Sequence, residues 1–363
     1  MVWGDYLSFE YGKPVKDKQS IDGNVPVFGT NGQIGTSHLP PLCKIPSFVV
    51  GRKGAYRGVH YSSVPFSVID TAFYALPLTD KVDLKWAYYK FLTYDINRMD
   101  SGSAIPSTDR YELYKIEVEI PSLETQKKIV SVLDVFENII RVNSEINENL
   151  LQQAQTIFTQ EFLMFDEVPD GWQEGSLLDI ADYLNGLAMQ KFRPKEGEQG
   201  IPVLKIKELR QGSCDASSEL CSPAIKSEYI VHDGDVIFSW SGSLLVDLWC
   251  GGTCGLNQHL FKVTSSKYDK WFYYAWTNHH LDKFIAIAAG MATTMGHIKR
   301  KELAKAEVLI PSKADYDRIG GLLAPLYDLV IANRIENRKL AALRDELLPQ
   351  LMSGQIDVSE VSL

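Results

Sequence analysis

Cysteine is scarce in this chain, and no long apolar run occurs. Five cysteines among 363 residues are too few, and odd in number, for a disulfide-stabilised secreted fold. The longest apolar stretch, at residues 285–292, is far shorter than the ~20 residues of a membrane-spanning helix. The first 13 residues carry Asp5 and Glu10 and lack the apolar core of a signal peptide. We therefore expect a cytoplasmic protein with reduced thiols and no membrane partner.

The few cysteines leave a zinc site as one alternative. Cys214, Cys221, Cys250 and Cys254 lie in the same part of the chain. Zinc is commonly held by four thiolates, but their spacing here is unusual for such a site. Buried structural thiols are the simpler interpretation, so we predict no metal site.

Motifs of catalytic and nucleotide-binding sites are missing too. The chain has no G-x-x-x-x-G-K-[ST] loop, H-E-x-x-H helix, G-x-S-x-G elbow or G-x-G-x-x-G turn. Its one glycine-rich basic loop, at residues 51–58, fits no nucleotide-binding pattern, and spacing names no Ser or Cys partner for His279, His280 or His297. These absences predict a protein that is not an enzyme. An enzyme with an unrecognised site stays open as an alternative.

A basic charge excess is also lacking. The net charge is −9, whereas proteins that bind nucleic acid by bulk electrostatics usually present a basic surface. Basic and acidic residues balance over residues 1–121, and the acidic excess is concentrated in residues 122–166 and 311–363. The charge therefore argues against a protein that binds nucleic acid by bulk electrostatics.

The chain does contain an internal repeat. Glu119-Ile120-Pro121-Ser122 returns as Leu309-Ile310-Pro311-Ser312, Val25-Pro26-Val27 as Ile201-Pro202-Val203, and Phe48-Val49-Val50 as Val236-Ile237-Phe238. Asp5 and Gly12 likewise match Asp179 and Gly186. Each half is thus predicted to be a globular portion followed by the same kind of tail.

The two tails are predicted to be long helices. Apolar residues recur at alternating three- and four-residue steps from Ile129 and again in the second tail, which is the spacing of a coiled-coil face. Asparagines interrupt both faces at matching positions, Asn143 and Asn147 in the first tail and Asn333 and Asn337 in the second. We assign them to helix register, because polar core groups satisfy one another in only one alignment. The alternative is that one of each pair faces solvent or a partner.

The globular portions differ from the tails in pattern. Short β-branched runs occur at residues 47–50, 68–76, 235–238 and 260–263, with helical patches at 84–94 and 270–287. This pattern predicts an α+β fold repeated twice, with a helical spacer after each copy. Within the second spacer, Pro325 is expected to kink the helix.

Four segments carry a family resemblance that spans nearly the whole chain. They read Phe9-Glu10-Tyr11-Gly12-Lys13-Pro14, Val25-Pro26-Val27-Phe28-Gly29-Thr30-Asn31-Gly32, Ser101-Gly102-Ser103-Ala104-Ile105-Pro106 and Ile120-Pro121-Ser122-Leu123-Glu124-Thr125-Gln126-Lys127-Lys128-Ile129. The last, a strand ending in Pro before a Glu-x-Gln-Lys helix start, is the most specific. In these segments the chain resembles the specificity (S) subunits of type I restriction-modification enzymes. The second copy departs from the pattern at residues 289–296 and 315–318.

The resemblance implies two target-recognition domains, each reading one half of a split DNA sequence. Two long helices, paired as an antiparallel coiled coil, would hold these domains apart and set the spacer. The corresponding boundaries are 1–121 for the first domain, 122–165 for the central helix, 166–311 for the second domain, and 312–363 for the C-terminal helix and tail. A coiled-coil scaffold with two protein-binding domains is the alternative.

The same resemblance implies partners and the absence of catalysis in this chain. Double-stranded DNA, two methyltransferase (M) subunits docked on the helices, and restriction (R) motor subunits reached through the complex are the expected partners. No cofactor is expected here. S-adenosylmethionine, and ATP and Mg for restriction, would bind the partner subunits.

Side chains that read DNA must reach base edges, as Arg or Lys does on guanine and Asn or Gln on adenine. Candidates in the first domain are Asn31, Arg52, Lys53, Tyr56 and Arg57, and those in the second are Lys205, Lys207, Ser241, Ser243 and Lys299. Glycines in loop 51–58 would let the backbone approach a phosphate. A solvated turn is the alternative for this loop, and a charged helix start is the alternative for Lys299. Trp86, Trp271 and Trp276 lie at helical spacing and are predicted to be core residues.

Overall fold

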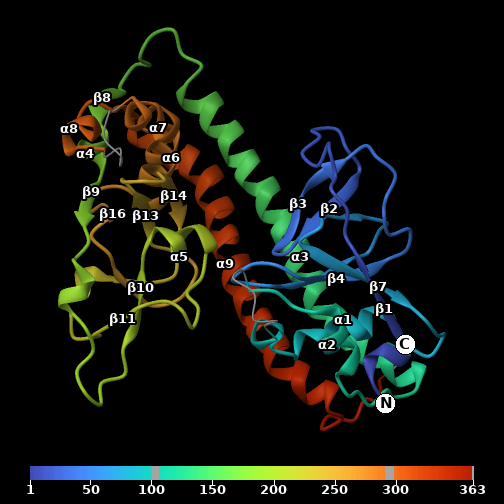
Figure 1. Ribbon diagram of the computed structural model, residues 1–363. Coiled ribbons are helices and arrows are strands. Elements are labelled where there is room, and N and C mark those ends of the chain that lie inside the picture. Colours follow the sequence, from blue (N-terminus) through green and yellow to red (C-terminus); the bar gives the residue numbers. More distant parts are fainter. Residues whose placement is uncertain (100–105, 291–297, 362–363) are drawn as a thin grey trace. The chain divides into compact units, whose positions relative to one another are not determined.

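The computed structural model describes residues 1–99, 106–290 and 298–361. The chain divides into two compact units, Met1–Asn138 with Ala341–Leu363, and Ile139–Leu340 (Figure 1). Two long helices cross the division, so each unit contains a part of both. Residues 101–105 and 291–296, which belong to the segments compared with the family, lie outside the described residues, as does His297.

The first unit combines two sheets with short helices. Its elements are η1 (Trp3–Asp5), β1 (Leu7–Tyr11), β2 (Val25–Gly29), β3 (Gly32–Ser37), β4 (Ser47–Gly51), β5 (Val59–Ser62), β6 (Ser67–Val68), β7 (Ala72–Pro77), α1 (Leu84–Leu92), η2 (Ile96–Arg98) and α2 (Arg110–Lys115). One sheet is antiparallel, in the order β1-β7-β4-β5. The other has the order β3-β2-β6, with β2 and β6 parallel.

Strand β4 lies at the centre of this unit's core. Its side chains alternate between faces, so Phe48 packs with Trp86 of α1 in one cluster, while Val49 packs with Phe28 of β2 in another. Asp83 caps α1 by accepting hydrogen bonds from the backbone N–H groups of residues 85 and 86, each at 2.9 Å. Trp86 is buried, as predicted.

The second unit repeats this plan with additions. Its elements are β8 (Gln173–Ser176), α4 (Leu177–Ile180), β9 (Asp182–Asn185), η3 (Met189–Lys191), β10 (Ile201–Leu204), α5 (Ile206–Gln211), β11 (Leu220–Cys221), η4 (Ser227–Tyr229), β12 (Ile230–Val231), β13 (Val236–Ser239), β14 (Leu245–Leu248), β15 (Cys254–Leu256), β16 (Leu260–Thr264), α6 (Lys270–His279), α7 (Leu281–Ala289), α8 (Arg300–Leu303) and β17 (Glu307–Ile310). The sheets have the orders β14-β13-β16-β9, β11-β10-β15-β12 and β17-β8. Trp271 and Trp276 are buried in its core, as predicted.

The two units share their topology as well as their sequence repeat. The order β1-β7-β4-β5 corresponds strand by strand to β9-β16-β13-β14, and the parallel pair β2–β6 corresponds to β10–β15. Gly12 and Gly186, which match in the repeat, show why both copies have glycine at this position. A Cβ on Gly12 would lie 2.0 Å from the carbonyl oxygen of Ile69, and one on Gly186 would lie 2.2 Å from that of Asn257. Only glycine allows this close backbone approach in either unit.

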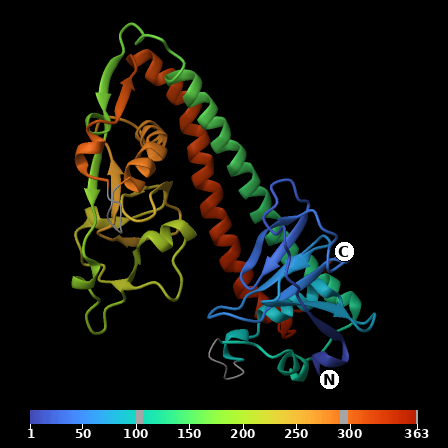
Figure 2. The ribbon, with the colours of Figure 1, turned by 45° about the horizontal axis from the view of Figure 1, so that its top comes forward.

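The long helices α3 (Leu123–Phe162) and α9 (Lys313–Met352) pair antiparallel within each unit. In the second unit, Asn143 Nδ2 donates to Asn337 Oδ1 and Asn333 Nδ2 to Asn147 Oδ1, both at 2.9 Å. In the first unit, Arg344 on α9 pairs with α3 at 2.6 Å. Both views show the helices running alongside each other (Figure 2). The predicted fold class is therefore confirmed. Within the described residues, no helix is long and apolar enough to span a membrane.

Helix α9 continues through Pro325. Both Pro325 and Gly321, whose carbonyl loses its helical partner, are exposed to water. The kink expected at Pro325 stays a prediction. Two other local expectations differ from the structure. The helix predicted at 270–287 is two helices, α6 and α7, separated at His280. The strand predicted at 68–76 is interrupted before β7 begins at Ala72.

Candidate nucleic-acid interface

The glycine-rich basic loop 51–58 joins β4 to β5 and is held by backbone contacts from distant segments. Thr30 Oγ1 lies 2.9 Å from the carbonyl oxygen of Lys53. The N–H of Gly54 donates to the carbonyl of Pro106 at 3.0 Å, and the N–H of Thr108 to that of Arg52 at 2.8 Å. These contacts fix the loop in place. We call loop 51–58, together with the residues that contact it, the first corner.

Two arginines flank one tyrosine at this corner. The guanidinium carbons of Arg52 and Arg110 each lie 4.9 Å from the centre of the Tyr11 ring. A hydrogen bond with Tyr111 raises the pKa of Arg110 above its ordinary value. Among the described residues, neither guanidinium has a carboxylate partner. Cations gathered on an aromatic face without an acidic partner form a surface that favours an anion.

The first-domain candidates occupy different environments around the corner. Lys53, Tyr56 and Asn31 are exposed, and the Asn31 amide nitrogen, turned toward the backbone of Tyr56, lies 2.8 Å from its carbonyl oxygen. Arg57 differs, because its side chain is only 2% exposed and its Nη2 donates to the carbonyl oxygen of Asn97 at 2.6 Å. Arg57 therefore supports the loop from inside and is not part of its outer surface.

The second unit has a corresponding loop between β13 and β14, with other side chains. We call this loop, together with the residues that contact it, the second corner. The N–H of Ile298 donates to the carbonyl of Trp240 at 3.0 Å, matching the bond between Thr108 and Arg52. Trp240 Nε1 donates to Asn185 Oδ1 at 2.9 Å, and Asn185 holds the position that Tyr11 holds in the first unit. The stacked cations of the first corner are thus replaced by an indole and an amide.

A polar group completes the second corner. Ser241 Oγ lies 3.1 Å from His259 Nδ1, and Gln258 Nε2 lies 3.3 Å from His259 Nε2. Lys299, exposed at the start of α8, and Arg300 correspond in the repeat to residues 109 and 110 of the first unit. The structure therefore places the candidates Ser241 and Lys299 in the second corner.

The other second-domain candidates have partners within their own unit. Lys205 pairs with Glu219, and Lys207 Nζ donates to Ser217 Oγ at 2.7 Å. Ser243 contributes its carbonyl oxygen, which accepts a hydrogen bond from Ser239 Oγ at 2.9 Å. Both lysines are engaged with neighbouring acidic or polar groups of their own unit.

Sequence reasoning missed part of both corners. Tyr11, Arg110, Asn185, Gln258 and His259 reach them from segments far from the basic loop. The repeat contained one usable signal, since Asn185 corresponds to Tyr11 and His259 to Thr71. Composition and spacing alone did not distinguish these residues from ordinary strand ends.

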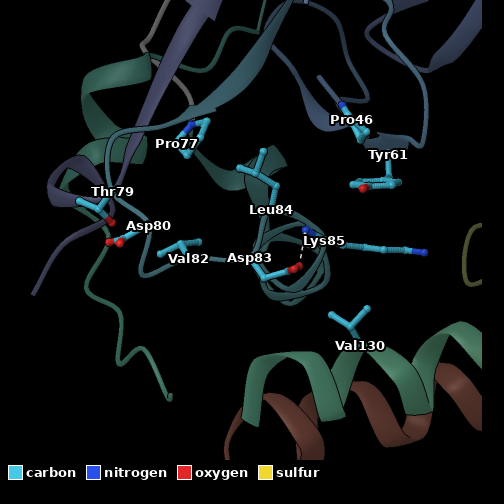
Figure 3. Close-up of a pocket in the computed structure, with 10 residues that line it drawn as sticks. All are labelled: Pro46, Tyr61, Pro77, Thr79, Asp80, Val82, Asp83, Leu84, Lys85 and Val130. Carbon is cyan, nitrogen blue, oxygen red and sulfur yellow. Dashed lines mark hydrogen bonds between the residues drawn. The ribbon is translucent and has the colours of Figure 1, made fainter. Parts of the chain in front are cut away.

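A cavity of about 470 Å³ in the first unit lies beside α1 (Figure 3). It is lined by Tyr61 of β5, Leu84 and Lys85 of α1, and Val130 of α3, and burial raises the pKa of Tyr61 to about 12. The ammonium of Lys85 pairs with Asp134 at 2.7 Å. These charged groups attach α1 to α3, so the cavity belongs to the packing of the unit.

The cysteines all carry free thiols. Cys214 Sγ lies 3.3 Å from Cys254 Sγ, and this contact lowers the pKa of Cys214 and raises that of Cys254. Cys250 Sγ instead faces the carbonyl of Ile331 on α9. In the described part of the chain, no three His, Cys, Asp or Glu side chains gather to hold a metal ion.

Comparison with known proteins identifies relatives of the whole arrangement. The family described as "Type I restriction modification DNA specificity domain" matches residues 10–152 and 169–344. The specificity subunit of type I restriction enzyme MjaIX from Methanocaldococcus jannaschii is 26% identical over 310 residues, covering 78% of this chain and 71% of its own. That of EcoBI from Escherichia coli is 26% identical over 189 residues, covering 51% and 37%.

A solved structure shares the fold. The crystal structure of the S subunit of a type I restriction-modification system from M. genitalium has a TM-score of 0.61, with 15% identity, over 97% of this chain and 95% of its own. The two family matches fall on the two copies of the internal repeat and together cover most of the chain. The relatives are specificity subunits, so the chain has a recognition role and is not an enzyme. It belongs to the family of type I restriction-modification specificity subunits, with two target-recognition domains.

Proposed function

We propose that the two corners are the DNA-reading surfaces, and that each reads one half of a bipartite double-stranded target. The observation that carries this proposal is the repetition of one backbone corner with different side chains. Arg52 and Arg110 flank Tyr11 in the first unit, whereas Trp240, Ser241 and His259 lie together in the second. A backbone arrangement that is the same in both units, with different side chains on it, would allow each unit to read a half-site of different sequence.

The chemistry of each corner favours a different mode of reading. Arginine and lysine are suited to guanine O6 and N7 and to phosphate, so Arg52, Lys53 and Arg110 favour these contacts. In the second unit, the amide of Gln258 is suited to adenine, while Lys299 and Arg300 are suited to phosphate. Asn31 and Tyr56 lie beside the first corner as further contacts.

We further propose that the recognition domains span 1–121 and 166–311 and that helices 122–165 and 312–363 set the spacer and dock two methyltransferase subunits. Exposed apolar residues on α3, namely Ile139, Val142 and Ile146, support docking, because an apolar stripe at three- and four-residue spacing suits a partner helix. Restriction motor subunits would join through that complex. S-adenosylmethionine, ATP and Mg would bind the partners, and the assembly would work in the cytoplasm.

Methylome sequencing of a host with and without this gene, each with the cognate methyltransferase, tests the proposal. We expect one split motif to be methylated only when the gene is present. The double variant Arg52→Ala/Arg110→Ala should relax one half of that motif, and Gln258→Ala/His259→Ala the other half. A motif that is unchanged by both variants would contradict the two corners. If deleting the gene left all methylation unchanged, the proposed function would be contradicted and a protein-binding scaffold would be favoured.

A further inference from the structure

A cleft of about 640 Å³ lies in the second unit, away from the corner that we assign to DNA. Its walls are the end of α3 with residues 163–168, the junction of α6 and α7, and strand β17. Phe162 and Trp276 are buried in its apolar wall. None of the residues discussed above for DNA contact lines this cleft.

Apolar side chains around the cleft are exposed to solvent. Leu163, Phe165 and Val168 are 39%, 44% and 41% exposed, although they follow one another closely in the chain. Scattered exposed apolar residues are ordinary, but a group beside a cleft marks a surface that a partner covers. These residues thus indicate an apolar occupant.

Carboxylates outnumber cationic groups in the lining of this cleft. Asp166, Glu167, Glu174 and Glu307 line it, whereas Lys283 is the single ammonium among the described lining residues. Within the described residues, none of the four carboxylates takes part in a hydrogen bond or ion pair. The cleft is therefore acidic and favours a cationic occupant.

The first unit shows which segment packs at the corresponding place there. After α9 the chain packs back on its own unit, where Ile356, Val358 and Val361 join the core. Lys128 Nζ donates to the carbonyl of Ser359 at 2.7 Å and fixes this tail. In the second unit, the segment after α3 leaves its apolar residues exposed. The corresponding place in the first unit is a smaller cleft of about 460 Å³, and Ile356 and Val358 of the tail are part of its lining. An apolar segment thus packs at this place in the first unit, whereas the corresponding segment of the second unit leaves its apolar side chains exposed.

We propose that this cleft binds a segment of the methyltransferase subunit that presents an apolar side chain next to Lys or Arg. The proposal rests on the function proposed above, which supplies that partner. Charge argues against a second copy of this chain as the occupant. Its corresponding tail carries Asp357 and Glu360, which would be repelled by the four carboxylates.

Charge reversal tests the electrostatic part of the proposal. The affinity of full-length Glu167→Lys/Glu174→Lys for the purified cognate methyltransferase subunit should fall at least tenfold at low salt, with a smaller loss at high salt. The matched control is Glu196→Lys/Glu228→Lys, which reverses two exposed carboxylates of the same unit away from the cleft. Equal affinities for both double variants would overturn the proposal.

A second variant tests the apolar part and guards against misfolding. Phe165→Ser/Val168→Ser changes only exposed side chains, so it should keep the wild-type unfolding transition and still lose at least tenfold in affinity. A photo-reactive phenylalanine analogue at position 165 should cross-link to a methyltransferase peptide that contains Lys or Arg. Cross-linking to an acidic peptide, to another copy of this chain, or to nothing in the assembled complex would contradict the proposal.

The two proposals fail differently. If the gene directs methylation of a split motif but the cleft variants assemble normally, the cleft proposal is wrong and the recognition function stands. If the wild-type gene directs no methylation with its cognate methyltransferase, the proposed function itself is wrong.

Discussion

At the scale of single residues, Tyr11 has the most distinctive surroundings, because two guanidinium groups flank its ring. We predict that Arg110→Ala weakens binding of the assembled complex to its target by ~1–3 kcal/mol. The loss should come from the half-site read by the first unit. Binding titrations with duplexes altered in one half-site or the other measure this effect.

Lys115→Ala is the matched control for that experiment. Lys115 lies in the same helix, α2, but is exposed and paired with Glu112 at 2.7 Å. Its removal should leave target affinity nearly unchanged. If both variants lost affinity equally for every duplex, the effect would be one of general charge and not of the corner.

His280 gives a prediction about pH. It is 7% exposed, its Nε2 donates to the carbonyl of Glu307 at 2.8 Å, and burial lowers its pKa to about 4. An unfolded histidine titrates near pH 6.5, so between these values the unfolded state binds more protons. The free energy of unfolding should therefore fall as pH drops from ~6.5 to ~4, by up to about 3 kcal/mol.

Urea unfolding of wild type and His280→Gln at pH 7 and pH 5 measures this contribution. The charged and titratable neighbours His279, Lys283 and Glu307 remain in both proteins, so the difference isolates His280. We expect the variant to lose less stability than wild type between the two pH values. Parallel losses would show that the imidazole does not carry this pH dependence.

At the scale of elements, the asparagine pairs of α3 and α9 are the clearest test of helix register. Asn147 and Asn333 are buried and hydrogen-bonded to each other. Asn147→Leu leaves the Asn333 amide without its partner and should cost ~1–3 kcal/mol. Adding Asn333→Leu should recover much of that loss, because neither buried group is then unsatisfied.

Chemical denaturation of the two single variants and the double variant measures this coupling. Disulfide trapping of the helix pair would additionally report its register. We expect the double variant to sample more than one alignment, since the polar pair no longer selects one. A double variant as destabilised as the sum of the single variants would refute the pairing.

A second element-scale prediction concerns how α9 holds the second unit. Arg338 Nη1 and Nη2 donate to the two carboxylate oxygens of Asp233 at 2.7 and 2.8 Å. Arg334 Nη1 pairs with Asp247 Oδ1 at 2.7 Å. Bidentate, half-buried pairs of this kind are stronger than exposed ones. Arg338→Ala should therefore lower the unfolding free energy by ~1–3 kcal/mol, as measured by denaturation.

The exposed Arg210→Ala, in the same unit, should change that stability by less than ~0.5 kcal/mol. A double-mutant cycle with Asp233→Asn isolates the pair. Additive losses would mean that Arg338 acts through packing rather than through its partner.

At the scale of the whole molecule, the two helices each cross the division between the units. The crossings fall between residues 138 and 139 and between 340 and 341. Inserting four residues at both crossings adds ~6 Å of helix and rotates the following part by ~40° beyond one full turn. Contacts inside each unit are kept, so both half-site sequences should stay the same.

The expected change is in the spacer, which should lengthen by one or two base pairs, because a turn of DNA covers ~34–36 Å. Methylome sequencing of the insertion variant reads the half-sites and the spacer together. An active variant with the original spacer would refute the helices as a ruler. Control of spacing would then belong to the partner subunits.

Local pattern was enough to predict much of this architecture. The three- and four-residue apolar steps of the tails became α3 and α9, and repeated segments such as Val25–Val27 and 201–203 became corresponding strands β2 and β10. Periodicity is visible in sequence because a helix or strand presents one face at a fixed repeat. Family resemblance added the antiparallel pairing of the helices.

Tertiary structure decided which side chains share a site. Arg110 reaches Tyr11 across 98 intervening residues, and Arg57, four positions from Lys53, is buried whereas Lys53 is exposed. Pro325 fits within α9 because its face is exposed to water. Sequence thus determined the repeat, the two long helices and the family. Sheet register, side-chain direction and solvent exposure depend on contacts between distant segments, so the corners and the acidic cleft were visible only in the folded chain.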